Sequence, residues 1–407
     1  MDNSNKIVFD GHFVANAHKD NRLYIAENGD ILVTEITGNA VFKDYTGSAN
    51  NLSSIGGSAN FTNWKGTADQ LTTIGQDAEF TNWKGNVNKL TKIGYDARFE
   101  NWEGSADNLL KIPKKLYGKN WIGSANKLKT IGGDADLENS TCSLSSLTKI
   151  GGNAILRNAK GSLDSLETIG GHAEFQHWQG SANNLDKIGK NAYFYDWEGS
   201  ADNLVSIGGC AYFNGGKTRG LGWSGSISSW KNSANKLTTI GANAQFQNWE
   251  GTADNLTTIG GEADFDHWAG SANKLISIGS SARFSWWKGT ANNLEVIKGH
   301  ADFEDWAGYL PKLKTLGASA NGKNWKGLTD NIKEKYIFPE YPVNQEDGAV
   351  MDYIYDIEQK QYQGDGHFKK GNEKDFIKIN KKKHGDDEQF IDQCLKFVEF
   401  VNKTINQ

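Results

Sequence analysis

Tryptophan recurs at an interval of 19 residues along most of the chain. Trp64, Trp83, Trp102 and Trp121 have this spacing, and it returns from Trp178 to Trp197 and again from Trp230 to Trp325. Self-similarity at a short, fixed period is typical of solenoids, in which each coil buries its apolar residues only against its neighbours. The interval therefore predicts a repeat architecture before any other property of the sequence is considered.

One repeat reads Ile-Gly-Gly-x-Ala-x-Phe-x-Asn-Trp-x-Gly-Ser-Ala-Asp/Asn-x-Leu-x-x, as in residues 55–73. If Tyr45 takes the place of a tryptophan, the phased positions run from 45 to 325 and give about fifteen coils. A helix-turn-helix unit needs about 33 residues, which is more than this period provides. One short strand and two tight corners fit it, and fifteen coils stacked about 4.8 Å apart would form a rod of about 70 Å.

Within a repeat, Ala59-x-Phe61 alternates as in a strand with one buried face, so a column of Ala and Phe is expected to point inward. Glycines before this strand and after the Trp suit corners that need positive φ or close backbone approach. The Asn that precedes most of the tryptophans, such as Asn63, is expected to form a ladder whose amides bond the backbone at each corner.

Residues 166–175 (Leu-Glu-Thr-Ile-Gly-Gly-His-Ala-Glu-Phe) and their equivalents resemble leucine-rich repeats, closest in style to receptor L-domains and bacterial members. The chain departs from that pattern because Ala replaces a large strand residue, Trp stands near the usual Asn, and 19 residues is shorter than the common length. Either a leucine-rich-repeat horseshoe or a straighter parallel β-helix satisfies the pattern. The resemblance implies binding of proteins or glycans through the strand face.

The ends of the chain differ from residues 35–327, which carry the repeats. Residues 1–34 alternate around Asn28-Gly29, which predicts an N-terminal β-hairpin cap. Beyond Gly327 the period stops, and residues 328–407 are expected to form a helical C-terminal cap or a small module. Helices are predicted at residues 345–362 and 387–405, the second with Asp386 or Asp387 as N-cap.

Composition narrows the possible partners and compartments. The net charge is −5 and no column is basic, which argues against a nucleic-acid partner, and the chain contains no apolar run long enough for a membrane span. Three cysteines make a disulfide framework improbable. Because the N-terminus lacks a basic region followed by an apolar stretch, the expected location is the cytoplasm, or outside the cell by export without a conventional signal peptide.

The sequence contains no arrangement typical of catalysis, and neither a cofactor nor a metal is expected. His172 and His177 point in different directions, whereas a zinc site needs three or four converging ligands. The stretch Gly215-Gly-Lys-Thr218 resembles only the end of a phosphate-binding loop, because Ala211 stands where that motif requires glycine. We therefore expect a protein that is not an enzyme. Whether the C-terminal module has an enzymatic activity stays open.

Irregular residues on the outward strand face are the candidate binding residues. Tyr193, Tyr195 and Tyr212 place three phenols on neighbouring coils, and an insertion at residues 214–228 follows with Arg219 and Trp223. Trp286 is a further aromatic residue outside the repeat pattern. Loops on rigid scaffolds often carry function, and Tyr, Trp and Arg dominate interface hot spots.

These features predict a non-enzymatic recognition protein that binds a protein partner on the strand face and the 214–228 loop. Two alternatives remain. In one, the solenoid of a secreted effector or toxin targets an active C-terminal module; in the other, the chain is an adhesin that binds glycans. The sequence does not identify the partner or the oligomeric state.

Overall fold

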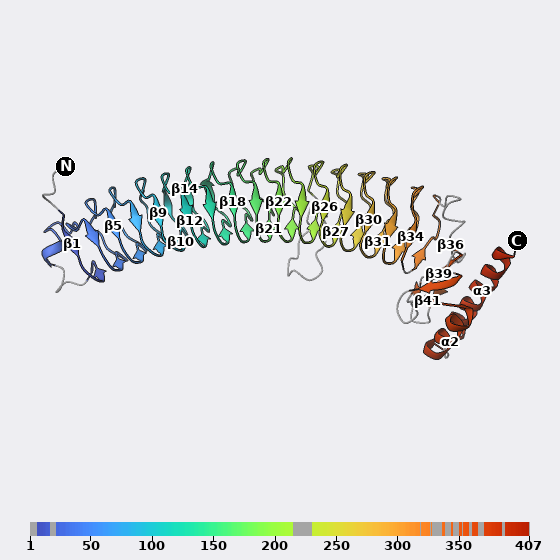
Figure 1. Ribbon diagram of the computed structural model, residues 1–407. Coiled ribbons are helices and arrows are strands. Elements are labelled where there is room, and N and C mark those ends of the chain that lie inside the picture. The colour runs from blue at the N-terminus through green and yellow to red at the C-terminus, as the bar shows by residue number, and fades with distance from the viewer. Residues whose placement is uncertain are drawn as a thin grey trace. The chain divides into compact units, whose positions relative to one another are not determined.

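The chain forms a parallel β-solenoid of about 14 turns and two C-terminal helices (Figure 1). This computed structural model describes residues 6–16, 22–214, 230–317, 319–325, 327, 336–337, 343–344, 350–351, 353–357, 360–364, 370–384 and 387–406. It divides the chain into two compact units, residues 1–207 (unit 1) and 208–407 (unit 2). The predicted fold class is confirmed.

Each coil contains a sharp bend at the Gly-Gly step with a two-residue strand on either side. In a typical coil, β5 (Ser54–Ile55) precedes the bend and β6 (Ala59–Asn60) follows it. Each of these strands pairs in parallel with its equivalent one repeat later, so Ile55 lies opposite Ile74 and Ala59 opposite Ala78. The predicted strand at Ala-x is present, and the structure adds the strand that ends at the isoleucine.

Unit 1 contains two long ladders and one short one. Strands before the bend form the isoleucine ladder: β1 (Val8–Phe9), β3 (Glu35–Ile36), β5, β7 (Thr73–Ile74), β9 (Lys92–Ile93), β12 (Lys111–Ile112), β15 (Thr130–Ile131), β18 (Lys149–Ile150), β20 (Thr168–Ile169), β22 (Lys187–Ile188) and β24 (Ser206–Ile207). Strands after the bend form the alanine ladder: β2 (Phe13–Val14), β4 (Ala40–Val41), β6, β8 (Ala78–Glu79), β10 (Ala97–Arg98), β13 (Leu116–Tyr117), β16 (Ala135–Asp136), β19 (Ala154–Ile155), β21 (Ala173–Glu174) and β23 (Ala192–Tyr193). A third sheet joins β11 (Glu103–Ser105), β14 (Ile122–Ser124) and β17 (Thr141–Ser143).

Unit 2 repeats the same two ladders. Its isoleucine ladder consists of β26 (Thr239–Ile240), β28 (Thr258–Ile259), β30 (Ser277–Ile278), β32 (Val296–Ile297) and β34 (Thr315–Leu316). Its alanine ladder consists of β25 (Ala211–Tyr212), β27 (Ala244–Gln245), β29 (Ala263–Asp264), β31 (Ala282–Arg283), β33 (Ala301–Asp302) and β35 (Ala320–Asn321).

Buried columns of one residue type fill the interior of the coils. Ile, Ala, Phe, Trp and Leu from successive repeats are almost all completely buried. The indoles stack on one another, with ring centroids 5.3 Å apart for Trp64 and Trp83 and 5.7 Å apart for Trp102 and Trp121. Stacked aromatic pairs add about 0.5–1.5 kcal/mol beyond the area that they bury, so the column stabilises the register of the coils.

A hydrogen bond ties each indole to the coil before it. Trp64 Nε1–H donates to the Gly47 carbonyl at 2.8 Å and Trp83 Nε1–H to the Gly66 carbonyl at 3.0 Å, and the same bond recurs in both units. A Cβ on Gly66 would lie 2.1 Å from the Gly47 oxygen and 2.7 Å from Trp64 Nε1. The glycine two residues after the Trp is therefore required by this close approach of two backbones and a ring.

The asparagine before each tryptophan forms the predicted ladder, with a different bonding pattern. Asn82, Asn101 and Asn120 have φ between 52° and 56°, the left-handed conformation that Asn adopts at the lowest cost among side-chain-bearing residues. The Asn101 amide donates to the Asn82 side-chain oxygen at 3.0 Å, and Asn120 donates to Asn101 at 2.8 Å. The amides thus bond one another, and not the backbone as the sequence analysis expected.

Pro113 interrupts the isoleucine ladder in unit 1. In neighbouring coils the residue after the isoleucine donates its N–H to the isoleucine carbonyl one coil earlier, as Gly94 does to Ile74 and Gly132 to Ile112. Proline has no N–H to donate. Among the described strands, this ladder accordingly splits into β1–β9 and β12 onward.

The N-terminal segment, predicted as a hairpin cap over residues 1–34, mostly extends the ladders. Its strands β1 and β2 pair in parallel with β3 and β4, ahead of a short 3₁₀ helix at Arg22–Tyr24. Antiparallel pairing around Asn28-Gly29 is a single bridge, between Ile25 and Ile31. The Tyr45 hydroxyl donates to the Gly29 carbonyl, as the indoles do to later glycines, so this turn covers the first member of the indole column.

The C-terminal region contains strands where a helix was predicted at residues 345–362. The segments β39 (Tyr353–Asp356) and β40 (Gln361–Gly364) form an antiparallel hairpin, flanked in the sheet by β36 (Tyr336–Ile337) and β41 (Lys370–Gly371). Strands β37 (Val343–Asn344) and β38 (Val350–Met351) form a separate pair. All four residues of β39 are buried, and its alternating Tyr and Ile favour a strand.

Two helices cover this hairpin. They are α2 (Glu373–His384) and α3 (Glu388–Ile405), and Asp387 caps α3 as predicted by accepting the Phe390 N–H at 2.8 Å. Tyr362, Phe376 and Phe397 are among the residues of their shared core. Within unit 2, the Tyr336 hydroxyl accepts the Leu316 N–H at the end of β34, which satisfies a donor that the last coil would otherwise leave unpaired.

We expect Trp102→Ala to destabilise unit 1 by about 3–5 kcal/mol, because the change removes a buried ring, its stacking and its hydrogen bond. Urea unfolding followed by circular dichroism measures the effect. The control is Ile122→Ala, a residue 55% exposed in the next coil, which should cost about 0.5 kcal/mol or less. Equal losses in the two variants would contradict the stacked column.

Burial raises the pKa of the Cys394 thiol to about 12 in the C-terminal core, with a further contribution from Asp387. Because the thiolate is the reactive form, native Cys394 should resist iodoacetamide at pH 8 and react at once in urea. Mass spectrometry of the modified peptide tests this, and rapid native modification would show that the helix pair opens or packs differently.

Candidate functional site

The outer strand face is the surface on which the repeats differ most in side-chain chemistry. In each coil it consists of three residues, which are counted from the alanine of the alanine ladder. They are the residue directly before that alanine, the residue directly after it, and the residue three positions after it. In the coil of β6 these are Ser58, Asn60 and Thr62. They alternate with buried residues, so each side chain points away from the core.

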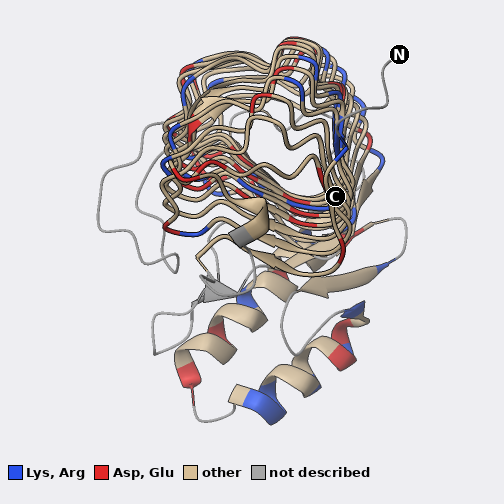
Figure 2. Ribbon diagram, turned by 90° about the vertical axis from the view of Figure 1, so that its left-hand side faces the viewer, with Lys and Arg blue, Asp and Glu red and all other residues tan. Residues whose placement is uncertain are grey.

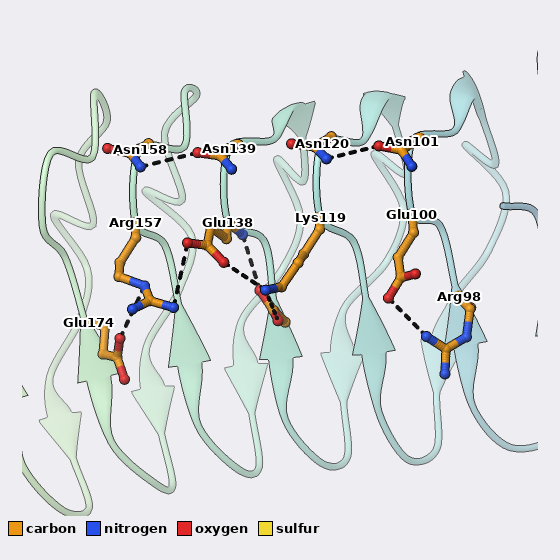
Figure 3. Close-up of polar contacts among 11 residues, drawn as sticks. Arg98, Glu100, Asn101, Lys119, Asn120, Glu138, Asn139, Arg157, Asn158 and Glu174 are labelled. Carbon is orange, nitrogen blue, oxygen red and sulfur yellow. Dashed lines mark hydrogen bonds and ion pairs between the residues drawn. The ribbon is translucent and has the colours of Figure 1, made fainter. Parts of the chain in front are cut away.

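Oppositely charged side chains pair from coil to coil on this face of unit 1 (Figure 3). Lys119 Nζ lies 2.7 Å from Glu138 and 3.6 Å from Asp136, and Arg157 lies 3.5 Å from Glu138 and 3.4 Å from Glu174. The hydrogen bond to Glu138 raises the pKa of Lys119, and Asp136 adds to the effect. Partly exposed pairs contribute about 0–1 kcal/mol each, so the main effect of this ladder is to neutralise the face locally.

Tyr193 and Tyr195, both predicted binding residues, pack against each other in unit 1. Their ring centroids are 6.2 Å apart at an interplanar angle of 76°. Tyr195 is only 9% exposed and its hydroxyl accepts the Gln176 amide at 3.0 Å, while Tyr193 is half-buried. The structure therefore presents Tyr193, and only the edge of Tyr195, to a partner.

The remaining predicted residues fall in unit 2 or outside the described residues. Tyr212 is half-buried on β25. Arg219 and Trp223 lie outside the described residues, as does nearly all of the 214–228 insertion. That these residues act together as one binding site therefore stays a prediction.

Trp286 is the most exposed of the predicted aromatic residues that the structure describes. Its side chain is 55% exposed, and its φ of 58° places it in the left-handed corner that Asn, Asp or His occupies in the other repeats. Its ring stacks on His267 of the preceding coil with centroids 6.1 Å apart. A bulky residue at positive φ carries about 1–3 kcal/mol of backbone strain, and such strain often marks functional positions.

A hollow of about 250 Å³ lies on the outer strand face of unit 2, and sequence reasoning did not detect it. Polar residues line it around the strands β27, β29, β31 and β33: Asn243, Gln245, Glu262, Asp264, Ser281, Arg283, His300 and Asp302. Burial raises the pKa of Asp264 in its wall, against the opposing effects of the Asp266 N–H and Arg283. The acidic character of these coils was visible in the sequence, but their concave shape was not.

The described residues contain no group of three or more His, Cys, Asp and Glu side chains placed to hold a metal ion. In the same residues, no helix has the length and apolar character needed to cross a membrane. Acidic and basic residues are interspersed around the coils (Figure 2).

No protein-family description, curated protein or solved structure matches the chain. The repeat architecture is nevertheless established by the parallel ladders and the stacked tryptophans. The chain is thus assigned to the β-solenoids by its structure alone.

We expect Trp286→Asn to stabilise unit 2 by about 1 kcal/mol, because Asn tolerates the left-handed corner at lower cost than Trp. The reverse change at an equivalent corner, Asn248→Trp, should destabilise by a similar amount. Urea denaturation of both variants tests the pair. A loss of stability in Trp286→Asn would contradict this account, because it would show that the indole stabilises unit 2 by packing.

Proposed function

We propose that this chain is a non-enzymatic recognition protein that binds a protein partner on its outer strand face, together with the 214–228 segment. The buried columns give each unit a stiff scaffold, and the outer strand face displays varied side chains upon it. Rigid surfaces of this kind lose little conformational entropy when a partner binds. Leucine-rich repeats, which the coils resemble, bind proteins or glycans through their strand face, and the proposal extends that use to this chain.

Trp286, at the corner directly after the outer strand face of its coil, is the observation that carries the proposal. An indole that is more than half exposed contributes little to folding, and at this corner it replaces a residue type that suits the backbone better. Tryptophan is among the residues most enriched at the energetic centres of protein interfaces. A binding role accounts for a side chain that is costly to the free protein.

Tyr193 gives independent support from unit 1. Its phenol is half-buried on the outer strand face, and contact with Tyr195 fixes its position. A pre-ordered aromatic ring loses little rotamer freedom on binding. The same face of the next few coils towards the N-terminus is occupied by the neutralised ion-pair ladder, which offers a partner fewer unpaired charges.

The test is affinity capture from native lysate with the full chain as bait, followed by mass spectrometry. We expect Trp286→Ala to lower recovery of the specific partner by about tenfold or more, as for a hot-spot residue. Tyr95→Ala is the matched control, because Tyr95 is also an aromatic residue about half exposed, at 51%, but lies at the bend before an alanine-ladder strand of unit 1 and not at the corner after such a strand. Equal recovery with the two variants would refute the role of Trp286.

A further inference from the structure

The hollow in unit 2 has the shape of a short trough along the stack of coils. Ala244, Ala263 and Ala282 line it, and because their methyl groups are buried in the core, backbone forms its floor. Outward side chains on either side of each alanine form the two walls. Four successive coils take part, from Asn243 to His300, which corresponds to about 14 Å along the stack.

Among the described side chains, two of the three carboxylates of the trough, those of Glu262 and Asp302, form no ion pair, unlike the paired charges on the same face in unit 1. Within the described residues, no Lys or Arg forms an ion pair with Glu262 or Asp302. Asp302 accepts only neutral donors, the Asn321 amide at 3.1 Å and the Glu304 N–H at 3.1 Å. Glu262 is exposed, and its carboxylate has no bonded partner among the described side chains.

Arg283 shows how a guanidinium fits this surface. It lies in the wall between the coils of Glu262 and Asp302, and its Nη1 contacts Asp264 Oδ2 at 3.3 Å. A second donor, the Gln247 amide, also bonds Asp264. Asp264 thus has two partners on the outer strand face, whereas Glu262 and Asp302 form no ion pair with the residues that the structure describes.

We propose that this trough binds an extended, basic segment of the protein partner, with a Lys or Arg side chain directed to Glu262 and another to Asp302. An extended chain rises about 3.3 Å per residue, so about four residues span the trough. Charge complementarity of this kind sets the orientation and the rate of association. This inference rests on the proposed function and names the chemistry of the segment recognised.

The experiment is fluorescence anisotropy with labelled tetra-arginine as the probe and labelled tetra-glutamate as the negative control, using the full chain at low salt. The double variant Glu262→Gln/Asp302→Asn should weaken tetra-arginine binding by about tenfold. The matched control is Glu250→Gln/Asp254→Asn, which makes the same change in net charge at two exposed positions of unit 2 outside the trough. It should leave the affinity within about twofold.

Equal weakening by both double variants would overturn the inference, because it would show that tetra-arginine binding depends only on the net charge of unit 2. Undetectable binding of tetra-arginine to the unaltered chain would overturn it as well. Thermal unfolding of each variant confirms that the fold is retained. Because this assay needs no partner, its outcome is independent of the capture experiment with Trp286→Ala, and failure of one proposal can be told from failure of the other.

Discussion

The contact between each indole and the glycine backbone of the coil before it is the constraint on which the solenoid depends. The indole N–H reaches a carbonyl 17 residues earlier, and the glycine two residues after the Trp admits the neighbouring carbonyl where a Cβ would clash. Insertion or deletion of a single residue within the strands and corners of a coil would put this bond, the ring stack and both ladders out of register together, whereas the insertion after Tyr212 leaves Ala211 paired with Ala244. The fixed interval of 19 residues follows from that coupling.

The contact between indole and glycine restricts residues inside the coils only. The side chains on the outer strand face can therefore differ from coil to coil. In unit 1 that freedom produces a self-neutralising ladder around Lys119, Glu138 and Arg157. In unit 2 it produces a trough with two carboxylates that lack cations, and a strained, exposed Trp286 at the adjoining corner. Within the described residues, the same scaffold thus carries mutually paired charges in one place and carboxylates without an ion pair in another.

The sequence predicted the features that repeat and missed those that do not. The inward Ala59 and Phe61 and the α3 cap at Asp387 were predictable because short-range spacing determines them, whereas positive φ was expected at glycines and is found mainly at the residue before the Trp. The helix expected at residues 345–362 was wrong. Tyr353 and Tyr355 lie in a sheet with Tyr362 and share a core with Phe376 of α2, so tertiary packing outweighs helical spacing.

The candidate site was predictable only in part, for a related reason. Trp286 stood out as an extra aromatic, but its positive φ depends on where the corner falls within the coil. Tyr195 seemed outward by alternation, yet the neighbouring Tyr193 and Gln176 cover it. The trough could not be predicted, because its character depends on which carboxylates have a cation in the neighbouring coil. Which side chains are neighbours follows only from the register between coils.

The most direct test of the account is the distance between equivalent exposed positions several coils apart. Lys65 and Gln179 occupy the same place in coils six intervals apart within unit 1. Cysteines at these two positions can carry nitroxide labels for measurement by pulsed electron paramagnetic resonance. In-register stacking predicts a narrow distribution near about 29 Å, six times the strand spacing. A broad distribution, or a separation well above that value, would contradict a coil for every tryptophan interval.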